Sequence, residues 1–80
     1  MEIKVVGSGC ANCKRLLQMV ERINQEIKAN ATIQYVTDIV AIAETGILKT
    51  PGLIINGKIV SYGRVPSIDE VKQMISSRMV

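Results

Sequence analysis

The sequence contains no histidine, no phenylalanine and no tryptophan, and it has only two cysteines and two prolines. Without histidine, neither a Ser-His-Asp nor a Cys-His catalytic system can form, and a zinc site that uses histidine is excluded as well. Because only two aromatic residues are present, a packed core must consist of Ile, Val, Leu and Met. The missing histidine therefore removes many nucleophilic and metal-dependent chemistries.

Long apolar runs and clusters of basic residues are also missing. The longest stretches without a charge, residues 5–13 and 29–37, hold nine residues each, whereas a membrane-spanning helix needs about 18. No basic region leads into an apolar signal core at the N-terminus, where residues 7–9 read Gly-Ser-Gly. Lys and Arg are scattered, the net charge is +3, and the sequence lacks the basic stripe and stacking aromatics of nucleic-acid-binding proteins. We therefore expect a cytoplasmic protein that binds neither a membrane nor nucleic acid.

The length of 80 residues, with 48% hydrophobic and 21% charged residues, is typical of one globular domain, which we expect to span residues 1–80. A domain of this size buries only about 60% of the surface of its unfolded chain, so its stability is marginal. A disulfide between Cys10 and Cys13 would close a very short loop and add about 2 kcal/mol at best. The two cysteines are therefore not expected to serve as a structural staple.

Hydrophobic spacing predicts the elements of the N-terminal half. A short strand over residues 3–6 ends at the Gly-Ser-Gly segment. From Cys13 to Ile27, apolar residues recur every three or four positions, which is the spacing of an amphipathic helix. We expect this helix to end at Asn30, because asparagine tolerates the left-handed conformation found at many helix ends. A second strand, rich in β-branched residues, is predicted over residues 32–36.

A short helix is predicted next, with Thr37 or Asp38 as its cap and Gly46 at its end. Its inward-facing residues are predicted to be Ile39, Val40 and Ala43, with Ile42 as a further candidate.

Turn and cap signals organise the C-terminal part. Asn56-Gly57 lies between the apolar runs 53–55 and 59–62 and is the strongest short-range signal for a two-residue β-hairpin. Ser67 and Glu70 form a capping box, in which Ser67 caps a last helix and Glu70 reaches back to it. That helix is predicted to bury Val71, Met74 and Ile75, with Met79 as a further candidate.

The element order β-α-β-α-β-β-α predicts an α/β fold. Strands joined through a helix are expected to be parallel by a right-handed crossover, whereas the two strands of the hairpin must be antiparallel. The expected arrangement is one mixed four-stranded sheet with helices on both faces.

Cys10-Ala11-Asn12-Cys13 is a C-x-x-C motif at the point where the first strand gives way to the first helix. Three-residue spacing on a helix places the two sulfurs on one side, close enough for a disulfide. Cys13 continues the apolar stripe and is predicted to be buried, whereas Cys10 lies outside it and is predicted to be exposed. A helix N-terminus stabilises a thiolate, and Lys14 and Arg15 add positive charge where a structural helix favours Asp or Glu.

We therefore interpret Cys10 as the nucleophile and Cys13 as the resolving thiol. The alternative is a pair of unreactive cysteines, one of them a packing residue. The strand-to-helix position of the pair and the absence of a third cysteine favour the reactive interpretation.

In their order along the chain, four motifs resemble the thioredoxin and glutaredoxin superfamily: the C-x-x-C motif, Thr50-Pro51, the Asn56-Gly57 hairpin and Gly63. More narrowly, residues 7–13 together with residues 63–65 are similar to the small prokaryotic redox-active disulfide proteins. The resemblance implies a thioredoxin-like fold and a thiol–disulfide oxidoreductase that needs neither a cofactor nor a metal.

The resemblance also implies that the Thr50–Pro51 peptide bond is cis and lies beside the disulfide. Thr50 would then offer its backbone to a substrate chain in a short β-type pairing, so Thr50 and Pro51 are candidate substrate-binding residues. From the residues alone, a proline that starts a strand is the simpler interpretation.

Two positions depart from the family patterns. Lys4 stands where thioredoxins carry a buried acid, about six residues before the nucleophile, so a proton relay through a carboxylate is not expected. Residues 62–64 do not reproduce the Gly-Gly and acidic pair with which glutaredoxins hold glutathione, so specific glutathione binding is not expected either.

The leading hypothesis is a thiol–disulfide oxidoreductase, a monomeric electron carrier that reduces disulfides in client proteins and is re-reduced by a thioredoxin-type or other dithiol reductase. A Cu(I)-binding metallochaperone-like module is the alternative, because two soft thiolates suit Cu(I). Such chaperones have the order β-α-β-β-α-β and a Met two residues before the first cysteine, where this chain has Ser8. A non-catalytic thioredoxin-like adaptor also stays open.

Overall fold

The computed structural model describes residues 1–78, and these residues form the predicted order of strands and helices. The strands are β1 (Glu2–Val6), β2 (Thr32–Val36), β3 (Gly52–Ile55) and β4 (Lys58–Tyr62). The helices are α1 (Ala11–Glu26), α2 (Ile39–Thr45) and α3 (Ile68–Ser76). Met79, a candidate for burial by the last helix, lies outside the described residues.

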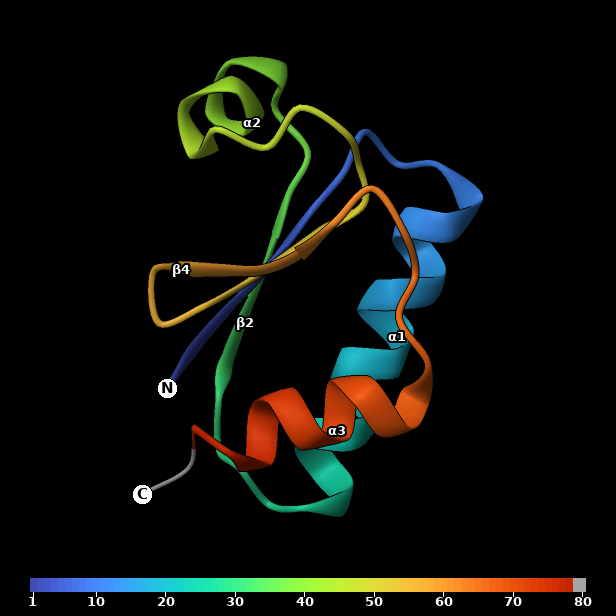
Figure 1. Cartoon of the computed structure of the whole chain (residues 1–80), viewed down its shortest axis with the longest axis vertical. Helices are drawn as coiled ribbons and strands as arrows, with labels where there is room; N and C mark the ends of the chain where they lie inside the picture. The colour runs from blue at the N-terminus through green and yellow to red at the C-terminus, as the bar shows by residue number, and fades with distance from the viewer. Residues whose placement is uncertain (79–80) are drawn as a thin grey trace.

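The four strands form one mixed sheet in the order β2-β1-β3-β4. β1 and β2 are parallel, as predicted for strands joined through a helix, whereas β3 is antiparallel to both β1 and β4. β3 therefore also runs antiparallel to β2, so the prediction of parallel strands is wrong for this pair, which α2 connects. β1 lies between β2 and β3, so their relative direction is set by how each pairs with β1 rather than by the helix that joins them. α1 and α3 cover one face of this sheet, and α2 lies on the other face, near the end at which β1 leads toward α1 (Figure 1). The predicted α/β fold, with helices on both faces of a mixed sheet, is therefore confirmed.

Successive side chains of a strand point to opposite faces of the sheet, so the core consists of two clusters. Ile3 and Val5 on β1 face α1 and α3 and belong to the larger cluster, whereas Val6 belongs to the smaller cluster beneath α2. The larger cluster also buries Leu16, Val20, Ile23, Leu53, Ile55, Val71 and Ile75. Because the larger cluster lies between the sheet and the helices α1 and α3, its packing holds α1 against the sheet.

α1 ends at Glu26, before the predicted stop at Asn30. The side chain of Asn24 stabilises this earlier end, because its Nδ2 donates to the carbonyl of Ala31 at 3.2 Å and its Oδ1 accepts from the Ala31 N–H at 2.9 Å. Asn30 does adopt a positive φ of 52°, but within the connection to β2 rather than at the helix end.

Most of the turn and cap predictions are confirmed. Asp38 caps α2, because its Oδ2 accepts the N–H of Ala41 at 3.1 Å. Asn56 and Gly57 have φ values of 51° and 81°, as a two-residue hairpin requires. Ser67 caps α3, with its hydroxyl accepting the N–H of Glu70 at 3.2 Å.

The prediction for the inner face of α2 is wrong. Ile39 and Val40 are 79% and 59% exposed, and Ala43 is exposed as well. Ile42 is the buried residue of this helix, and Ile47 joins it from the following loop. A helix of seven residues presents only a narrow strip to the sheet, so most of its apolar residues remain in solvent.

Within residues 1–78, no helix is both long enough and apolar enough to cross a membrane.

Candidate active site at the C-x-x-C motif

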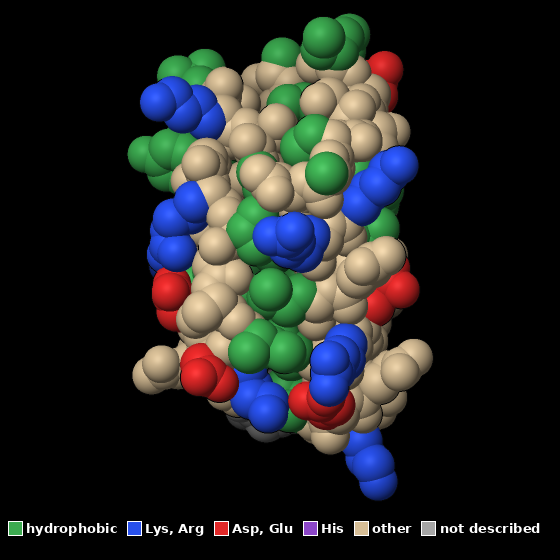
Figure 2. Space-filling view, turned by 90° about the vertical axis from the view of Figure 1, so that its right-hand side faces the viewer, with side chains coloured by type: hydrophobic (Ala, Val, Ile, Leu, Met, Phe, Trp, Pro, Cys, Tyr) green, Lys and Arg blue, Asp and Glu red, His purple; other side chains and the backbone are tan. Residues whose placement is uncertain are grey.

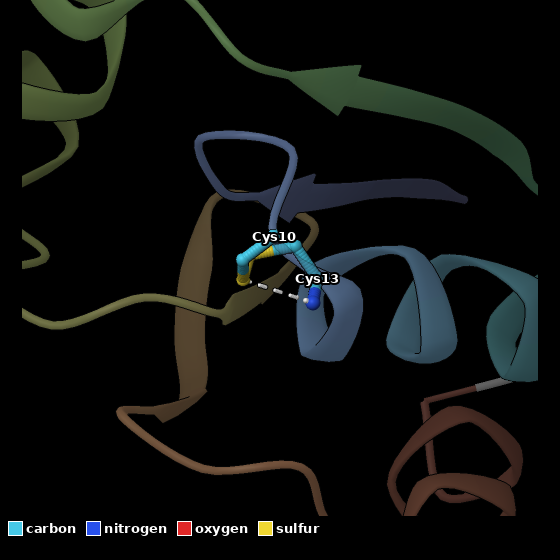
Figure 3. The surroundings of a disulfide bond; sticks show 2 residues. All are labelled: Cys10 and Cys13. Carbon is cyan, nitrogen blue, oxygen red and sulfur yellow. Dashed lines mark hydrogen bonds between the residues drawn. A yellow bond between two sulfur atoms is a disulfide. The ribbon is translucent and has the colours of Figure 1, made fainter.

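Cys10 and Cys13 are joined by a disulfide where the chain passes from β1 into α1 (Figure 3). Their Cα atoms lie 5.1 Å apart, within the usual range for disulfides. Cys10 is the N-cap residue of α1, and its Sγ accepts a hydrogen bond from the backbone N–H of Cys13 at 3.2 Å. The first sulfur therefore already occupies the position at which a helix N-terminus stabilises negative charge.

The two cysteines differ in their access to solvent. Cys13 is 0% exposed and lies on the buried stripe of α1 together with Leu16, Val20 and Ile23. Cys10 is exposed, as its place outside this stripe predicted. A large molecule arriving from solvent can therefore contact Cys10 but not Cys13.

Gly7 packs directly against the buried cysteine, a role that the sequence analysis missed. A Cβ at position 7 would overlap the Sγ of Cys13 and would lie 2.7 Å from its Cβ. The N–H of Gly7 also donates to the carbonyl of Val36 at 2.9 Å, which ties the start of the active-site loop to β2. From the sequence, Gly7 could be interpreted only as the end of a strand, because the neighbouring residues do not indicate that Cys13 packs against it.

Thr50-Pro51 lies beside the C-x-x-C loop. Gly52, the first residue of β3, pairs with Val6 of β1, so the preceding Pro51 comes next to Gly7. Figure 3 shows the segment that leads into β3 running past the disulfide. The peptide bond between Thr50 and Pro51 is cis. The fold thus brings the four candidate site residues, two from each segment, to the same end of the sheet.

Gly63 fixes the loop that carries Thr50. Its N–H donates to the carbonyls of both Lys49 and Pro51, each at 3.0 Å. Thr50 lies between Lys49 and Pro51, and its own backbone N–H and C=O have no hydrogen-bond partner within residues 1–78. Thr50 therefore has a backbone donor and acceptor that no other residue within 1–78 uses.

Arg64 follows this anchor and forms an ion pair that the sequence did not predict. Its Nη2 lies 2.8 Å from Oε2 of Glu70. The hydrogen bond from Arg64 is the main reason that the pKa of Glu70 lies below its ordinary value, and Ser67 lowers this pKa further. Glu70 is therefore ionised at neutral pH, and its charge offsets much of the charge of Arg64.

Lys4, which stands where thioredoxins carry a buried acid, lies on the opposite face of the sheet from α1. It pairs with Ile54 in β3 and lines a hollow of about 650 Å³ beside α2. The sheet thus separates Lys4 from the helix that carries Cys13, and no carboxylate occupies its position.

Comparison with known proteins agrees with this geometry. A family model described as a thioredoxin domain matches residues 1–76, a range that contains both cysteines and Thr50-Pro51. The chain is 33% identical to the thioredoxin of Methanothermobacter thermautotrophicus over 76 residues, covering 95% of this chain and 99% of the relative. It is 35% identical to the thioredoxin of Methanocaldococcus jannaschii over 75 residues, covering 94% of this chain and 86% of the relative.

Proposed function

The chain belongs to the thioredoxin family of thiol–disulfide oxidoreductases, and we propose that it is a dithiol electron carrier that reduces disulfides in client proteins. One observation carries this proposal: Cys10 is exposed at a helix N-terminus, while its disulfide partner Cys13 is fully buried. The first sulfur can meet a client, and the second can reach only the first. Within the proposal, residues 1–80 form one thioredoxin-like domain.

The first step is attack by the thiolate of Cys10 on one sulfur of the client disulfide. The N–H of Cys13, the dipole of α1 and the cations Lys14 and Arg15 all favour the thiolate over the thiol. A bond forms between Cys10 Sγ and this client sulfur while the client S–S bond breaks. The second client sulfur leaves with the electron pair and takes a proton from solvent. The product is a mixed disulfide between Cys10 and the client.

The second step uses Cys13. Its thiol loses a proton and attacks Cys10 Sγ, and the mixed disulfide breaks with its electron pair on the client sulfur, which is then protonated. The client has gained two electrons and two protons, and the carrier is left with the Cys10–Cys13 disulfide. A thioredoxin-type or other dithiol reductase must return these electrons. The direction of electron flow, a cytoplasmic location and a monomeric state stay predictions.

Thr50 is proposed to hold the client chain through its backbone. Its N–H and C=O have no partner among residues 1–78 and lie between the two carbonyls that Gly63 holds, at the end of the sheet that carries the disulfide. An extended client segment can therefore pair with them as an added strand. Pro51 supports this pairing, because its carbonyl accepts the N–H of Gly63 and so holds the loop at Thr50 in place.

We expect this pairing to be visible in a backbone scan of a client peptide. N-methylation of an amide next to the reactive cysteine should raise KM by about tenfold, because it removes a hydrogen bond worth roughly 1.4 kcal/mol. N-methylation of amides several residues away serves as the matched control and should leave KM within about twofold. A KM that responds equally at every position, or at none, would contradict the role of Thr50.

A Cu(I) chaperone is the competing function for the same two thiols. Within residues 1–78, a helix separates the second and third strands, whereas these two strands follow each other directly in the β-α-β-β-α-β order of those chaperones. We expect the reduced protein to cleave disulfides in an insulin-type assay at a rate far above that of an equal thiol concentration of a small monothiol. Tight one-to-one Cu(I) binding in a competition titration, without any thiol–disulfide exchange, would favour the chaperone instead.

A further inference from the structure

The first turns of α1 and α3 carry opposite charges. α3 begins with Asp69 and Glu70, which is the usual pattern because the positive end of the helix dipole stabilises acidic groups. α1 has no acidic residue in its first turn, and the exposed cations Lys14 and Arg15 follow Cys13 directly. The helix that carries the disulfide therefore begins with an electrostatic arrangement that is unfavourable for helix stability.

A third cation reaches the same end of the molecule from another segment. Lys49 directly precedes Thr50, and its side chain lies across Gly63, where an added Cβ would come within 3.3 Å of Lys49 Cβ and 3.6 Å of its Cδ. We refer to Lys14, Arg15 and Lys49 as the basic rim. Figure 2 shows blue side chains over the whole height of this face, whereas most of the red ones lie in the lower half, away from the end that holds the disulfide.

The basic rim has no acidic partner of its own within residues 1–78. The ion pairs there are Arg22–Glu26, Lys72–Glu26 and Arg64–Glu70, and none includes a residue of the rim. Two of these pairs use the same glutamate, Glu26. The three cations of the basic rim therefore lie at the disulfide end of the molecule without an ion-pair partner among the described residues.

An apolar surface adjoins the rim. Leu48 is 94% exposed and Tyr62 is 61% exposed, and both border a hollow of about 200 Å³. They directly precede Lys49 and Gly63 in the chain, so this apolar surface continues into the loop that carries Thr50. A segment that pairs with Thr50 would therefore meet both a cation and an apolar surface.

We propose that the basic rim selects protein segments that carry acidic side chains next to the cysteine that exchanges with Cys10, together with an apolar side chain. This inference rests on the proposed function and names the class of partner that the site accepts. Uncompensated charges of one sign around a site raise the local concentration of a partner of opposite charge and speed its association. They also repel basic partners, and both effects decline as salt screens the charges.

Three disulfide-bonded peptides test this selection. They share one sequence with an apolar residue and differ only in the residues that flank the reactive cysteine, which are Glu, Gln or Lys. Each kcat/KM is divided by the rate at which dithiothreitol reduces the same peptide, which removes differences in intrinsic reactivity. At low ionic strength we expect the Glu peptide to exceed the Lys peptide by about tenfold, with the Gln peptide between them. The ratio should approach one near 1 M salt, where the Debye length is about 3 Å.

Lys49→Glu is the decisive variant, because Lys49 lies outside the helix that holds the thiols. It should lower the Glu-to-Lys preference severalfold, whereas Lys58→Glu, the same charge reversal at the hairpin end of β4, should leave the preference unchanged. Equal normalised rates for the three peptides, or a preference that Lys49→Glu does not alter, would overturn the inference and leave the proposed function intact. Failure to reduce any of the three peptides would overturn the proposed function itself.

Discussion

Replacing Cys10 by serine is expected to abolish disulfide reduction, with a loss of roughly 10³-fold or more in kcat/KM. A serine hydroxyl is almost entirely protonated at neutral pH and is a poor nucleophile toward sulfur, so the helix N-terminus that stabilises a thiolate gains nothing from it. The loss should be equally large with a protein client and with a small symmetric disulfide, because the variant removes the attacking atom rather than a binding contact.

Cys13→Ser is expected to stop the same reaction one step later. Cys10 still attacks, but the mixed disulfide has no internal thiol to resolve it, so a covalent adduct accumulates that dithiothreitol releases. Intact-mass analysis of the adduct distinguishes the two variants, and Ser8→Ala, a change at an exposed neighbour, is the control that should keep full turnover. Full turnover by Cys10→Ser would contradict the role of Cys10 as the nucleophile. Adducts formed by Cys10→Ser and not by Cys13→Ser would mean that the two sulfurs have exchanged roles.

The different exposures of the two cysteines could be predicted because they follow from helix periodicity alone. A helix repeats every 3.6 residues, so the phase of Leu16, Val20 and Ile23 places Cys13 on the buried face and leaves Cys10 outside it. The hairpin at Asn56-Gly57 was predictable for a similar reason, since its φ values are a property of the two residues themselves. Both predictions depend on residues that are neighbours in the sequence.

The inner face of α2 could not be derived in this way. Apolar residues occur on several sides of this helix, so its sequence does not indicate whether Ile39, Val40 or Ile42 faces the sheet. The answer depends on where β1 and β3 lie, because Val6 and Ile54 form the surface that Ile42 contacts in the smaller cluster. A short helix with an apolar surface on more than one side takes its orientation from the rest of the fold.

Contacts between distant segments could not be predicted from the sequence, for the same reason. The end of α1 depends on the hydrogen bonds between Asn24 and Ala31 across the following turn. The loop of Thr50 depends on Gly63, which follows it only after the whole β3–β4 hairpin. The sequence contains all of these residues, but only the folded chain brings them together.

Gly7→Ala is expected to destabilise the reduced protein by about 1–3 kcal/mol, the usual range for overpacking a core. Gly7 does not have a positive φ, so the loss would come from the added methyl group rather than from the backbone. That methyl group would overlap Cys13 Sγ and would lie 2.7 Å from Cys13 Cβ. The overlap can be relieved only if the start of α1 moves away from β1. Because both cysteines lie at the start of α1, we also expect slower disulfide exchange. Urea unfolding under reducing conditions measures the free energy of unfolding.

A double-mutant cycle identifies the cause of this loss. In a Cys13→Ala background the sulfur is absent, so Gly7→Ala should cost clearly less than it does in the wild-type background. Gly9→Ala is the matched control: Gly9 has a φ of 88° and nothing within 4 Å of an added Cβ, so its cost comes from backbone strain and should be the same in both backgrounds. If Gly7→Ala costs as much without the sulfur as with it, the close packing of Gly7 on Cys13 does not position the active-site helix.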